Sequence, residues 1–293
     1  MKRIYVIGSV SIDLVVSTRV VPKKGETALG ESFFRTTGGK GANQAVAAAR
    51  LGENVHMIGR IGDDDFGQEI VENFERNQVD VTHLNIVPHM ATGTAHITLA
   101  DNDNSIIVVP SANNEVTFRN IKDQLAQLEE GDIVLLQQEI PADTVARVLA
   151  YCKQHGVVSI LNPAPYRDID EVVIDNADYL TPNETESAAL FKEDLDEALE
   201  RYPNKLIVTI GDKGARYFNG ENHVTVKGFK RDVKDTTGAG DTFNGALAVG
   251  LQKGFALDKA IELANLAASY SVTGMGAQGG MPTWQDIEGE FNV

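Results

Sequence analysis

The sequence contains a single cysteine, Cys152, among 293 residues. One cysteine excludes an internal disulfide and any metal site built from several cysteines. Six histidines are scattered along the chain without metal-ligand spacing, so we assign them no catalytic role. This composition is typical of a protein in a reducing compartment.

Positive charge and long apolar runs are also scarce. The 26 Lys and Arg against 42 Asp and Glu give a formal net charge of -16. Nucleic acids and anionic membrane surfaces attract clustered Lys and Arg, so neither is an expected partner. No stretch reaches the roughly 20 apolar residues of a membrane span, and the apolar run after Met1 is too short for a signal peptide. We therefore expect a cytoplasmic protein.

What the chain does have is apolar material for a large core and a regular alternation of patterns. Hydrophobic residues make up 42% of the chain. Short runs rich in β-branched residues alternate with helical patterns, which predicts an α/β fold with a doubly wound, mostly parallel sheet and helices on both faces, in one domain over residues 1–293. The predicted strands are 4–7, 55–59, 133–136, 157–161, 179–180 and 206–210; the predicted helices are 66–77, 116–128, 143–155, 183–201 and 258–268.

Two β-rich segments, at about residues 14–37 and 94–109, interrupt that alternation. The first is broken by Pro22 and Gly25, and the second has the pattern of a hairpin turning at 101–104. Together they predict a small antiparallel sheet that acts as a lid. Because exposed strand edges invite pairing with another chain, we expect a homodimer that forms through this lid.

A glycine-rich turn, Gly238, Ala239 and Gly240, leads into a helical pattern near the C-terminal end. Small residues leave the amides of such a turn open, and the helix dipole adds positive potential, so the turn is suited to binding an anion. Asp241 follows at once. On position alone it is either a helix cap or a general base beside a phosphate, and the cap is the commoner case.

A second glycine-rich segment, 38–52, leads into an alanine-rich helix pattern. It lacks the Gly-Lys-Ser/Thr ending of a P-loop. Close helix-on-sheet packing explains its alanines but leaves Lys40 and Asn43 unexplained. Asp13 follows the first strand, at the edge where open α/β sheets bind ligands, and a turn-forming role is equally compatible with that position.

Two further polar groups have a structural and a functional interpretation. Asn183 and Glu186 are spaced for a helix capping box, and equally for holding Mg²⁺ or a phosphate through water. The glycine-rich segment 271–280, with Asp235, is either a flexible loop or a source of carbonyl oxygens for a monovalent cation.

These motifs, in this order, resemble the signatures of the ribokinase family of sugar and nucleoside kinases (the PfkB superfamily). The segments at 38–52 and 235–250 resemble its two signatures, and Asn183 with Glu186 resembles its third hallmark; the similarity extends over essentially the whole chain. The resemblance implies a kinase that uses ATP, with Mg²⁺ and an activating K⁺, to phosphorylate the primary (O5) hydroxyl of D-ribose.

The resemblance also implies roles for individual residues. Asp241 would be the general base, and the amides of Gly238, Ala239 and Gly240 the anion hole. The sugar would be held by Ser11, Ile12, Asp13, Gly39, Lys40, Gly41, Ala42, Asn43 and Glu139. The nucleotide would be bound by Asn183, Glu186, Thr209, Ile210, Gly211, Asp212, Lys213, Gly214, Gly240 and Asn265. The potassium ligands would come from Asp235, Thr237, Ser271, Gly274, Gly276 and Gly280.

Other functions remain open at this point. Deoxyribose, fructose or a nucleoside could replace ribose as acceptor, since the sequence does not measure the pocket. A non-catalytic sugar sensor is disfavoured because it has no need of a base at Asp241. A nicotinamide oxidoreductase is disfavoured because the turn at 8–13 lacks the dinucleotide fingerprint.

Overall fold

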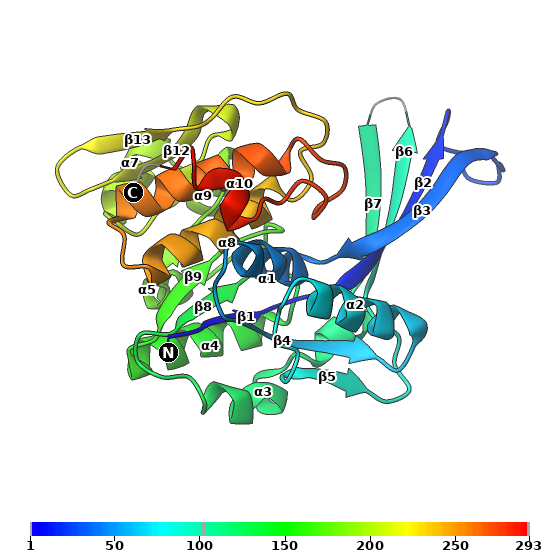
Figure 1. Cartoon of the computed structure of the whole chain (residues 1–293), viewed down its shortest axis with the longest axis horizontal. Coiled ribbons are helices and arrows are strands. Elements are labelled where there is room, and N and C mark those ends of the chain that lie inside the picture. The colour runs from blue at the N-terminus through cyan, green and yellow to red at the C-terminus, as the bar shows by residue number, and fades with distance from the viewer. Residues whose placement is uncertain (1, 101–102, 292–293) are drawn as a thin grey trace.

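The computed structural model describes residues 2–100 and 103–291, and a six-stranded parallel sheet forms the centre of this part of the chain (Figure 1). Its strand order is β10-β9-β8-β1-β4-β5. The strands are β1 (Ile4–Ile7), β4 (Val55–Gly62), β5 (Leu84–Val87), β8 (Ile133–Leu136), β9 (Val158–Leu161) and β10 (Tyr179–Leu180). The predicted parallel sheet is confirmed; β5 was not predicted.

Helices cover both faces of the sheet, as expected for a doubly wound fold. One face packs against α1 (Lys40–Arg50), α2 (Asp65–Arg76), α8 (Ala239–Gln252) and α9 (Leu257–Ser271); the other packs against α3 (Phe118–Leu125), α4 (Ala142–His155) and α5 (Glu171–Asn176). In β1, Ile4 and Val6 belong to the first core, whereas Tyr5 and Ile7 belong to the second. This alternation follows from the two-residue period of a strand.

Cys152 lies on α4 within the second core and is fully buried. Burial disfavours its thiolate and raises the pKa of the thiol to about 12. The side chain therefore behaves as a small apolar residue.

The two β-rich excursions form one four-stranded sheet that projects from the main body (Figure 1). Its order is β3-β2-β6-β7, with β2 (Ser11–Thr18), β3 (Gly30–Gly38), β6 (Thr94–Ala100) and β7 (Asp103–Val109). The predicted antiparallel excursion at 14–37 and the predicted hairpin at 94–109 are both present, although residues 101–102 of the second turn lie outside the described residues. The predicted lid sheet is present and its pairs β2–β3 and β6–β7 are antiparallel, but its central pair, β2 and β6, is parallel. Each is the outgoing strand of its hairpin, so both leave the body in the same direction.

A third, antiparallel sheet follows the central one in the chain. It contains β11 (Ile207–Thr209), β12 (Gly214–Phe218) and β13 (His223–Lys227), so the strand predicted at 206–210 belongs here. The helix predicted at 183–201 is two helices, α6 (Glu184–Phe191) and α7 (Leu195–Arg201), because Lys192 adopts a left-handed φ of 54° and Asp194 caps α7. The remaining short elements are the 3-10 helices η1 (Ser111–Glu115) and η2 (Gly211–Lys213), and α10 (Trp284–Ile287).

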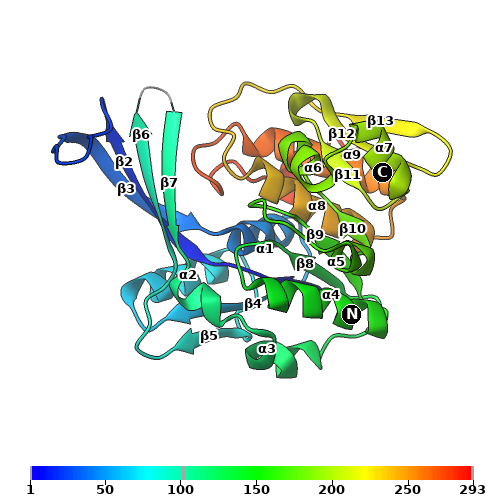
Figure 2. The ribbon, with the colours of Figure 1, turned by 180° about the vertical axis from the view of Figure 1, so that it is seen from behind.

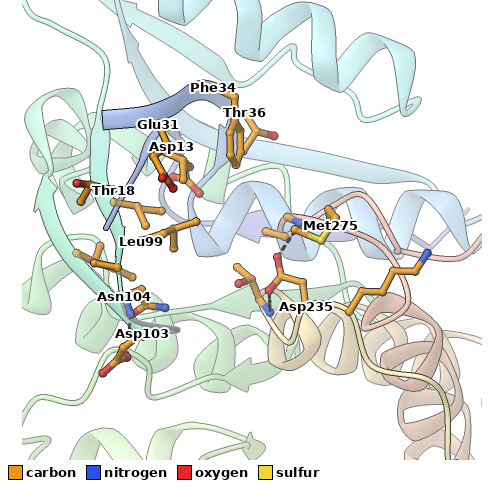
Figure 3. Close-up of a pocket in the computed structure, with 18 of the residues that line it drawn as sticks. Asp13, Thr18, Glu31, Phe34, Thr36, Leu99, Asp103, Asn104, Asp235 and Met275 are labelled. Atoms are coloured by element: carbon orange, nitrogen blue, oxygen red, sulfur yellow. Dashed lines mark hydrogen bonds between the residues drawn. The ribbon is translucent and has the colours of Figure 1, made fainter. Parts of the chain in front are cut away.

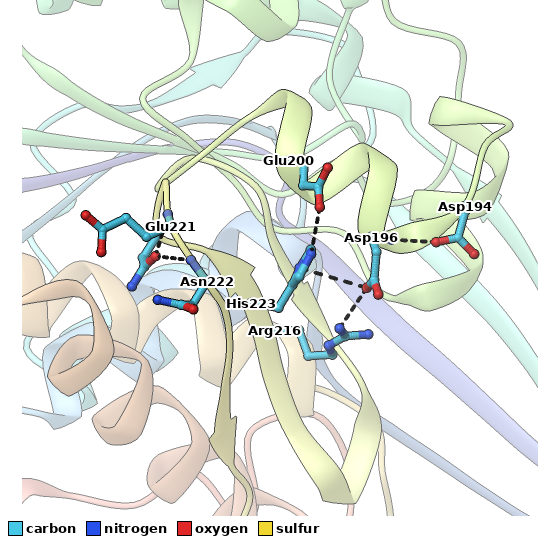
Figure 4. A network of polar contacts seen from close by, with 8 residues as sticks. Asp194, Asp196, Glu200, Arg216, Glu221, Asn222 and His223 are labelled. Carbon is cyan, nitrogen blue, oxygen red and sulfur yellow. Dashed lines mark hydrogen bonds and ion pairs between the residues drawn. The ribbon is translucent and has the colours of Figure 1, made fainter.

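Surface polar contacts fasten α7 to this third sheet (Figure 4). Arg216 Nη2 donates to Asp196 Oδ1 at 2.7 Å, and His223 Nε2 lies 3.0 Å from Glu200 Oε1. The partners are partly exposed, so solvent screens each pair and limits its contribution to stability. His223 therefore takes part in a structural contact.

Across residues 2–100 and 103–291, every helix falls short of the length and apolarity needed to span a bilayer.

Candidate active site

The start of α8 has the geometry that its glycine-rich sequence indicates. Gly238 is the N-cap residue with a left-handed φ of 80°, and a Cβ there would lie 2.3 Å from the carbonyl oxygen of Ala277. Only glycine fits this position. Gly238 and Gly240 line a cavity of about 200 Å³, whereas the Ala239 amide donates to Thr236 O at 3.2 Å.

Asp241 lies in the first turn of α8 and does not cap it. The structure records no side-chain cap for this helix. Instead, Asp241 Oδ2 accepts from Asn43 Nδ2 at 2.9 Å, and Oδ1 accepts from Gln44 Nε2 at 3.1 Å. The residue is 6% exposed and lines the cavity. Burial raises the pKa of its carboxyl, and the charge of Lys40 and the two amide donors oppose that rise. The capping alternative for Asp241 is therefore wrong.

A chain of buried amides holds these two donors in place. Gln278 Nε2 donates to Asn43 Oδ1 at 2.9 Å, and Gln137 Nε2 donates to Gln44 Oε1 at 2.7 Å. Gln44 Nε2 also reaches Asn162 Oδ1 at 3.2 Å. Sequence reasoning did not assign a role to Gln44, Gln137, Asn162 or Gln278. Their only signal was an excess of polar residues at strand ends and in the glycine-rich motifs.

Lys40, at the first position of α1, carries the positive charge of the cavity. Its ammonium lies among carboxylates, and Asp241 first, then Glu139 and Glu186, raise its pKa against the effect of burial. Glu139 accepts from the Lys40 backbone N–H at 3.0 Å and from Ser9 Oγ at 2.5 Å. Thus Glu139 fixes the start of α1, and Ser9 is a further residue that sequence reasoning missed.

Glycines allow α1 to start directly against the turn between β1 and β2. A Cβ at Gly39, where φ is 89°, would lie 2.9 Å from the Ser11 nitrogen, and one at Gly41 would lie 2.6 Å from Ser9 O. The side chains of Ile12 and Ala42 are buried in the core. The predicted sugar-binding segment is therefore a rigid unit whose exposed groups are polar or backbone.

Asp13 lies in β2, not in a turn, and points into a larger open cleft of about 800 Å³ between the lid and the loops near Asp235 and Met275 (Figure 3). Ser11 Oγ lies 3.2 Å from Asp13 Oδ1. Burial, with smaller contributions from Glu139 and Asp241, raises the pKa of Asp13 to about 6, while the Ser11 hydrogen bond opposes the rise. Three carboxylates thus converge where the cleft meets Lys40.

Asn183 and Glu186 form the capping box of α6. Glu186 N–H donates to Asn183 Oδ1 at 2.8 Å, and Asn183 N–H donates to Glu186 Oε2 at 2.9 Å. Both residues, with Thr209, also line the cavity that holds Asp241. The structural interpretation is confirmed, and the same side chains remain placed to face a ligand.

The other predicted nucleotide residues lie around β11 and β13. Residues 211–213 form η2, the turn between β11 and β12, in which Asp212 and Lys213 are exposed; the Ile210 side chain belongs to the core. Gly214 begins β12. Asn265 Nδ2 donates to Val226 O at 2.9 Å, so its amide holds β13 against α9.

The loops predicted to bind a cation are joined by Asp235. Its carboxylate accepts from Thr237 N–H at 2.9 Å and from Gly276 N–H at 2.8 Å, and these amides lower its pKa despite partial burial. Ser271, Gly274 and Gly280 pack backbone to backbone: a Cβ at Gly280 would lie 2.1 Å from Ser271 O. Among the described residues, no group of three or more His, Cys, Asp or Glu has metal-site geometry.

A buried carboxylate at an anion-binding helix start, next to a lysine and a lidded cleft, defines a small-molecule phosphotransferase. The profile of the pfkB family of carbohydrate kinases matches residues 1–284, and the chain belongs to this family. It is 51% identical to the ribokinase of Bacillus subtilis, over 98% of this chain and 99% of that protein. It is 46% identical to the ribokinase of Lactococcus lactis, over 99% of this chain and 97% of that protein. A solved structure of Arabidopsis thaliana ribokinase complexed with ribose and ATP superposes with a TM-score of 0.90 at 31% identity, over 100% of both chains.

Proposed function

We propose that the protein transfers the γ-phosphoryl group of ATP to the O5 hydroxyl of D-ribose, giving D-ribose 5-phosphate and ADP. The observation that carries this proposal is the position of Asp241, which Asn43 and Gln44 hold against the cavity at the start of α8. The whole-chain similarity to ribokinases supports ribose as the acceptor.

Asp241 acts as the general base. A sugar hydroxyl becomes a good nucleophile only as its proton leaves, and a carboxylate within about 3 Å can accept that proton. The raised pKa of Asp241 makes it a stronger base than an exposed carboxylate, while its two amide donors and Lys40 keep the charged form accessible. The amides of Gly238 and Gly240, which line the cavity, stabilise charge that develops on the transferred phosphoryl group, whereas the predicted third donor, the Ala239 amide, is engaged by Thr236 O.

The sugar occupies the end of the large cleft near Asp13. Carboxylates accept hydrogen bonds from several hydroxyls at once, which suits Asp13 and Glu139. Ser11, Asn43 and the backbone of 39–42 complete this side, with Lys40 at the junction to the phosphate cavity. The lid covers the cleft and excludes water, which otherwise competes as a phosphoryl acceptor.

The nucleotide occupies the side formed by Asn183, Glu186, the segment 209–214 and Asn265. Oxygen donors are the ligands that Mg²⁺ prefers, and the carboxylates of Glu186 and Asp241 face the same cavity, so the donor set fits a water-held Mg²⁺. When bound, the ion neutralises charge on the phosphates.

A monovalent cation, K⁺, fits the loops at 235–237 and 271–280. Asp235 is kept ionised by its amide partners, and the carbonyl-rich glycine loop lies against it. Thr237, Ser271, Gly274, Gly276 and Gly280 would add oxygen ligands. Gly238 packs on Ala277, so a cation that holds the 271–280 loop in place would also hold the start of α8 in place.

The lid forms a homodimer contact in this proposal. Phe34 and Ile106 face the cleft, so by strand alternation Phe33 and Ile107 face outward, and these two are 64% and 69% exposed. Large exposed apolar side chains on a sheet are typical of protein interfaces. The scarcity of cysteine supports a cytoplasmic location.

An acceptor panel tests the activity. ADP release is measured with D-ribose, 2-deoxyribose, fructose and a nucleoside, each in K⁺ and in Na⁺ at equal ionic strength. We expect ribose to give the highest kcat/KM and K⁺ to exceed Na⁺. Phosphorylation of another acceptor without any phosphorylation of ribose would refute the ribose assignment. Binding of ribose without any ADP release would favour a sensor. Equal rates in both salts would refute the proposed cation site.

A further inference from the structure

The hydrogen bonds behind Asp241 continue away from the cavity, to the place where α1 and α2 contact lid strand β3 (Figure 2). Gln278, in the loop that follows α9, is buried there. Its Nε2 donates to Asn43 Oδ1 of α1 at 2.9 Å. Its Oε1 accepts from Asn73 Nδ2 of α2 at 3.0 Å and from Thr37 Oγ1 of β3 at 3.3 Å. Gln278 therefore turns its donor toward the active site and its acceptor toward α2.

The same hydrogen bonds continue through α2 to a guanidinium group. Asn77 Nδ2 donates to Asn73 Oδ1 at 3.3 Å and to Asn73 O at 2.8 Å. Asn77 Oδ1 accepts from Arg50 Nε at 2.7 Å. Arg50 ends α1, and its Nη1 also donates to Gln278 O at 2.7 Å. The side chains that connect Arg50 to Asp241 form an amide series: Asn77, Asn73, Gln278 and Asn43.

The two ends of the amide series impose the same direction on it. An amide side chain can face a neighbour with its donor or with its acceptor, and only the surrounding hydrogen bonds decide which. A guanidinium only donates, and an ionised carboxylate only accepts. Arg50 and Asp241 therefore both favour the arrangement in which every amide donates toward Asp241. Reversal would place Asn43 Oδ1 against the carboxylate and the amino group of Asn77 against Arg50.

We propose that Gln278 and Arg50 are positioning residues, which hold the Asn43 amide with its Nδ2, and not its Oδ1, toward Asp241. The Asn43 donor stabilises the ionised carboxylate and opposes the rise in pKa that burial of Asp241 causes. An Asn43 amide that turned over would present an acceptor, which is favourable only when Asp241 is protonated. The amide series thus keeps Asp241 in the ionised form that a base requires. The role as a base rests on the proposed function, whereas the effect on ionisation does not.

Charged groups on other elements act on Asp241 alongside the amide series. Lys40 of α1 lowers the pKa of Asp241, and Glu139, which follows β8, raises it. Asp13 of β2 and Glu186 of α6 also interact with Asp241 electrostatically. All of these groups are kept when an uncharged member of the amide series is replaced by another uncharged residue. Such a replacement therefore isolates the effect of the hydrogen bonds.

Carbon NMR of the full chain, with isotope-labelled aspartate carboxyl groups, measures the pKa of Asp241 directly; the signal that is missing from Asp241→Asn identifies it. Gln278→Met keeps the length of the side chain but has no amide. We expect it to raise the pKa by about one pH unit, the lower end of the effect of losing a hydrogen bond to a charged group. Asn77→Leu separates Arg50 from the amide series without a change in charge, and should cause a smaller rise.

Thr37→Val is the matched control. It removes a hydrogen bond to the same Gln278 oxygen but leaves the amide series intact, so the pKa of Asp241 should not change. An unchanged pKa in Gln278→Met, or an equal rise in Thr37→Val, would overturn the proposal. An unchanged pKa in Asn77→Leu would overturn the role of Arg50. If Gln278→Met does not fold, Asn77→Leu still tests the amide series, because Asn77 is only partly buried.

The pH profile of kcat at saturating ribose gives a second readout. In Gln278→Met the acid limb should move upward by the same amount as the pKa of Asp241, and kcat should recover toward the parent value at higher pH. A low kcat at every pH would instead indicate general damage to the site and contradict a positioning role. Because the NMR titration needs no substrate, a protein that failed to phosphorylate ribose would refute the proposed function and leave the test of the amide series valid.

Discussion

Replacing Asp241 by Asn tests the assignment of the general base most directly. The two carboxylate oxygens each accept one buried amide donor, from Asn43 and from Gln44. Asparagine keeps one acceptor and presents an N–H₂ group in place of the other, so one buried donor loses its partner. That loss costs about 1–3 kcal/mol. Part of it is offset because a buried charge, disfavoured by desolvation, is removed as well.

The variant should therefore fold and bind both substrates, yet turn over far more slowly. Loss of a general base lowers kcat by about two to four orders of magnitude. Steady-state ADP release gives kcat, and calorimetric titration with ribose and with an ATP analogue measures binding separately. Asp123→Asn, an exposed position on α3, is the matched control and should retain full activity.

Two results would refute the reasoning. A near-normal kcat in Asp241→Asn would show that the Asp241 carboxylate is not the general base. A loss of ribose binding as large as the loss of turnover would show that the main role of Asp241 is to bind the sugar or to maintain the structure of the site, and not to transfer a proton.

Three further predictions follow from the same geometry. Asp13→Asn should remove the acid limb near pH 6 from the pH profile of kcat/KM for ribose. The pKa of Asp13 is higher in the folded state than in the unfolded chain, so the stability of the parent protein falls as pH rises from about 4 to 6. Measured by thermal unfolding, the variant should therefore have a higher Tm than the parent at pH 7 and the same Tm at pH 3.5. Gln44→Leu leaves the acceptors on Asp241 and Asn162 without their donor. Urea unfolding should show a free energy of unfolding lower by about 1–3 kcal/mol, and kcat should fall. An unchanged kcat would mean that Asn43 alone positions the base. Ile107→Asp should convert the dimer to a monomer in light scattering while leaving the fold intact; a parent protein that is itself monomeric would contradict the lid interface.

Local signals in the sequence predicted the framework of the fold, and they singled out Lys40, Gly238, Gly240 and Asp241, which line one cavity in the structure. Strand β1 and the helix start at Lys40 follow from apolar runs and glycines that act over a few neighbouring residues. The break between α6 and α7 was missed because no glycine or proline marks it; the chain turns at Lys192 through a left-handed conformation that lysine rarely adopts.

The amide network around Asp241 could not have been predicted in the same way. Asn43 and Gln278 are 235 positions apart in the chain, and their hydrogen bond exists only because α1 and the loop after α9 meet in space. An isolated Gln in a sequence has no pattern that distinguishes a buried positioning residue from a surface one. The parallel pairing of β2 with β6 likewise depends on where the intervening chain crosses the main body.

The burial of Cys152 makes the protein, in practice, free of reactive thiols. Its side chain is fully buried and its pKa of about 12 leaves little thiolate near neutral pH, so a maleimide dye has no native target on the folded chain. A cysteine introduced in the exposed turn between β2 and β3, for example Lys23→Cys, would then be labelled alone. Fluorescence from that single position would report whether the lid moves when sugar or nucleotide is added, without a cysteine-free background having to be built first.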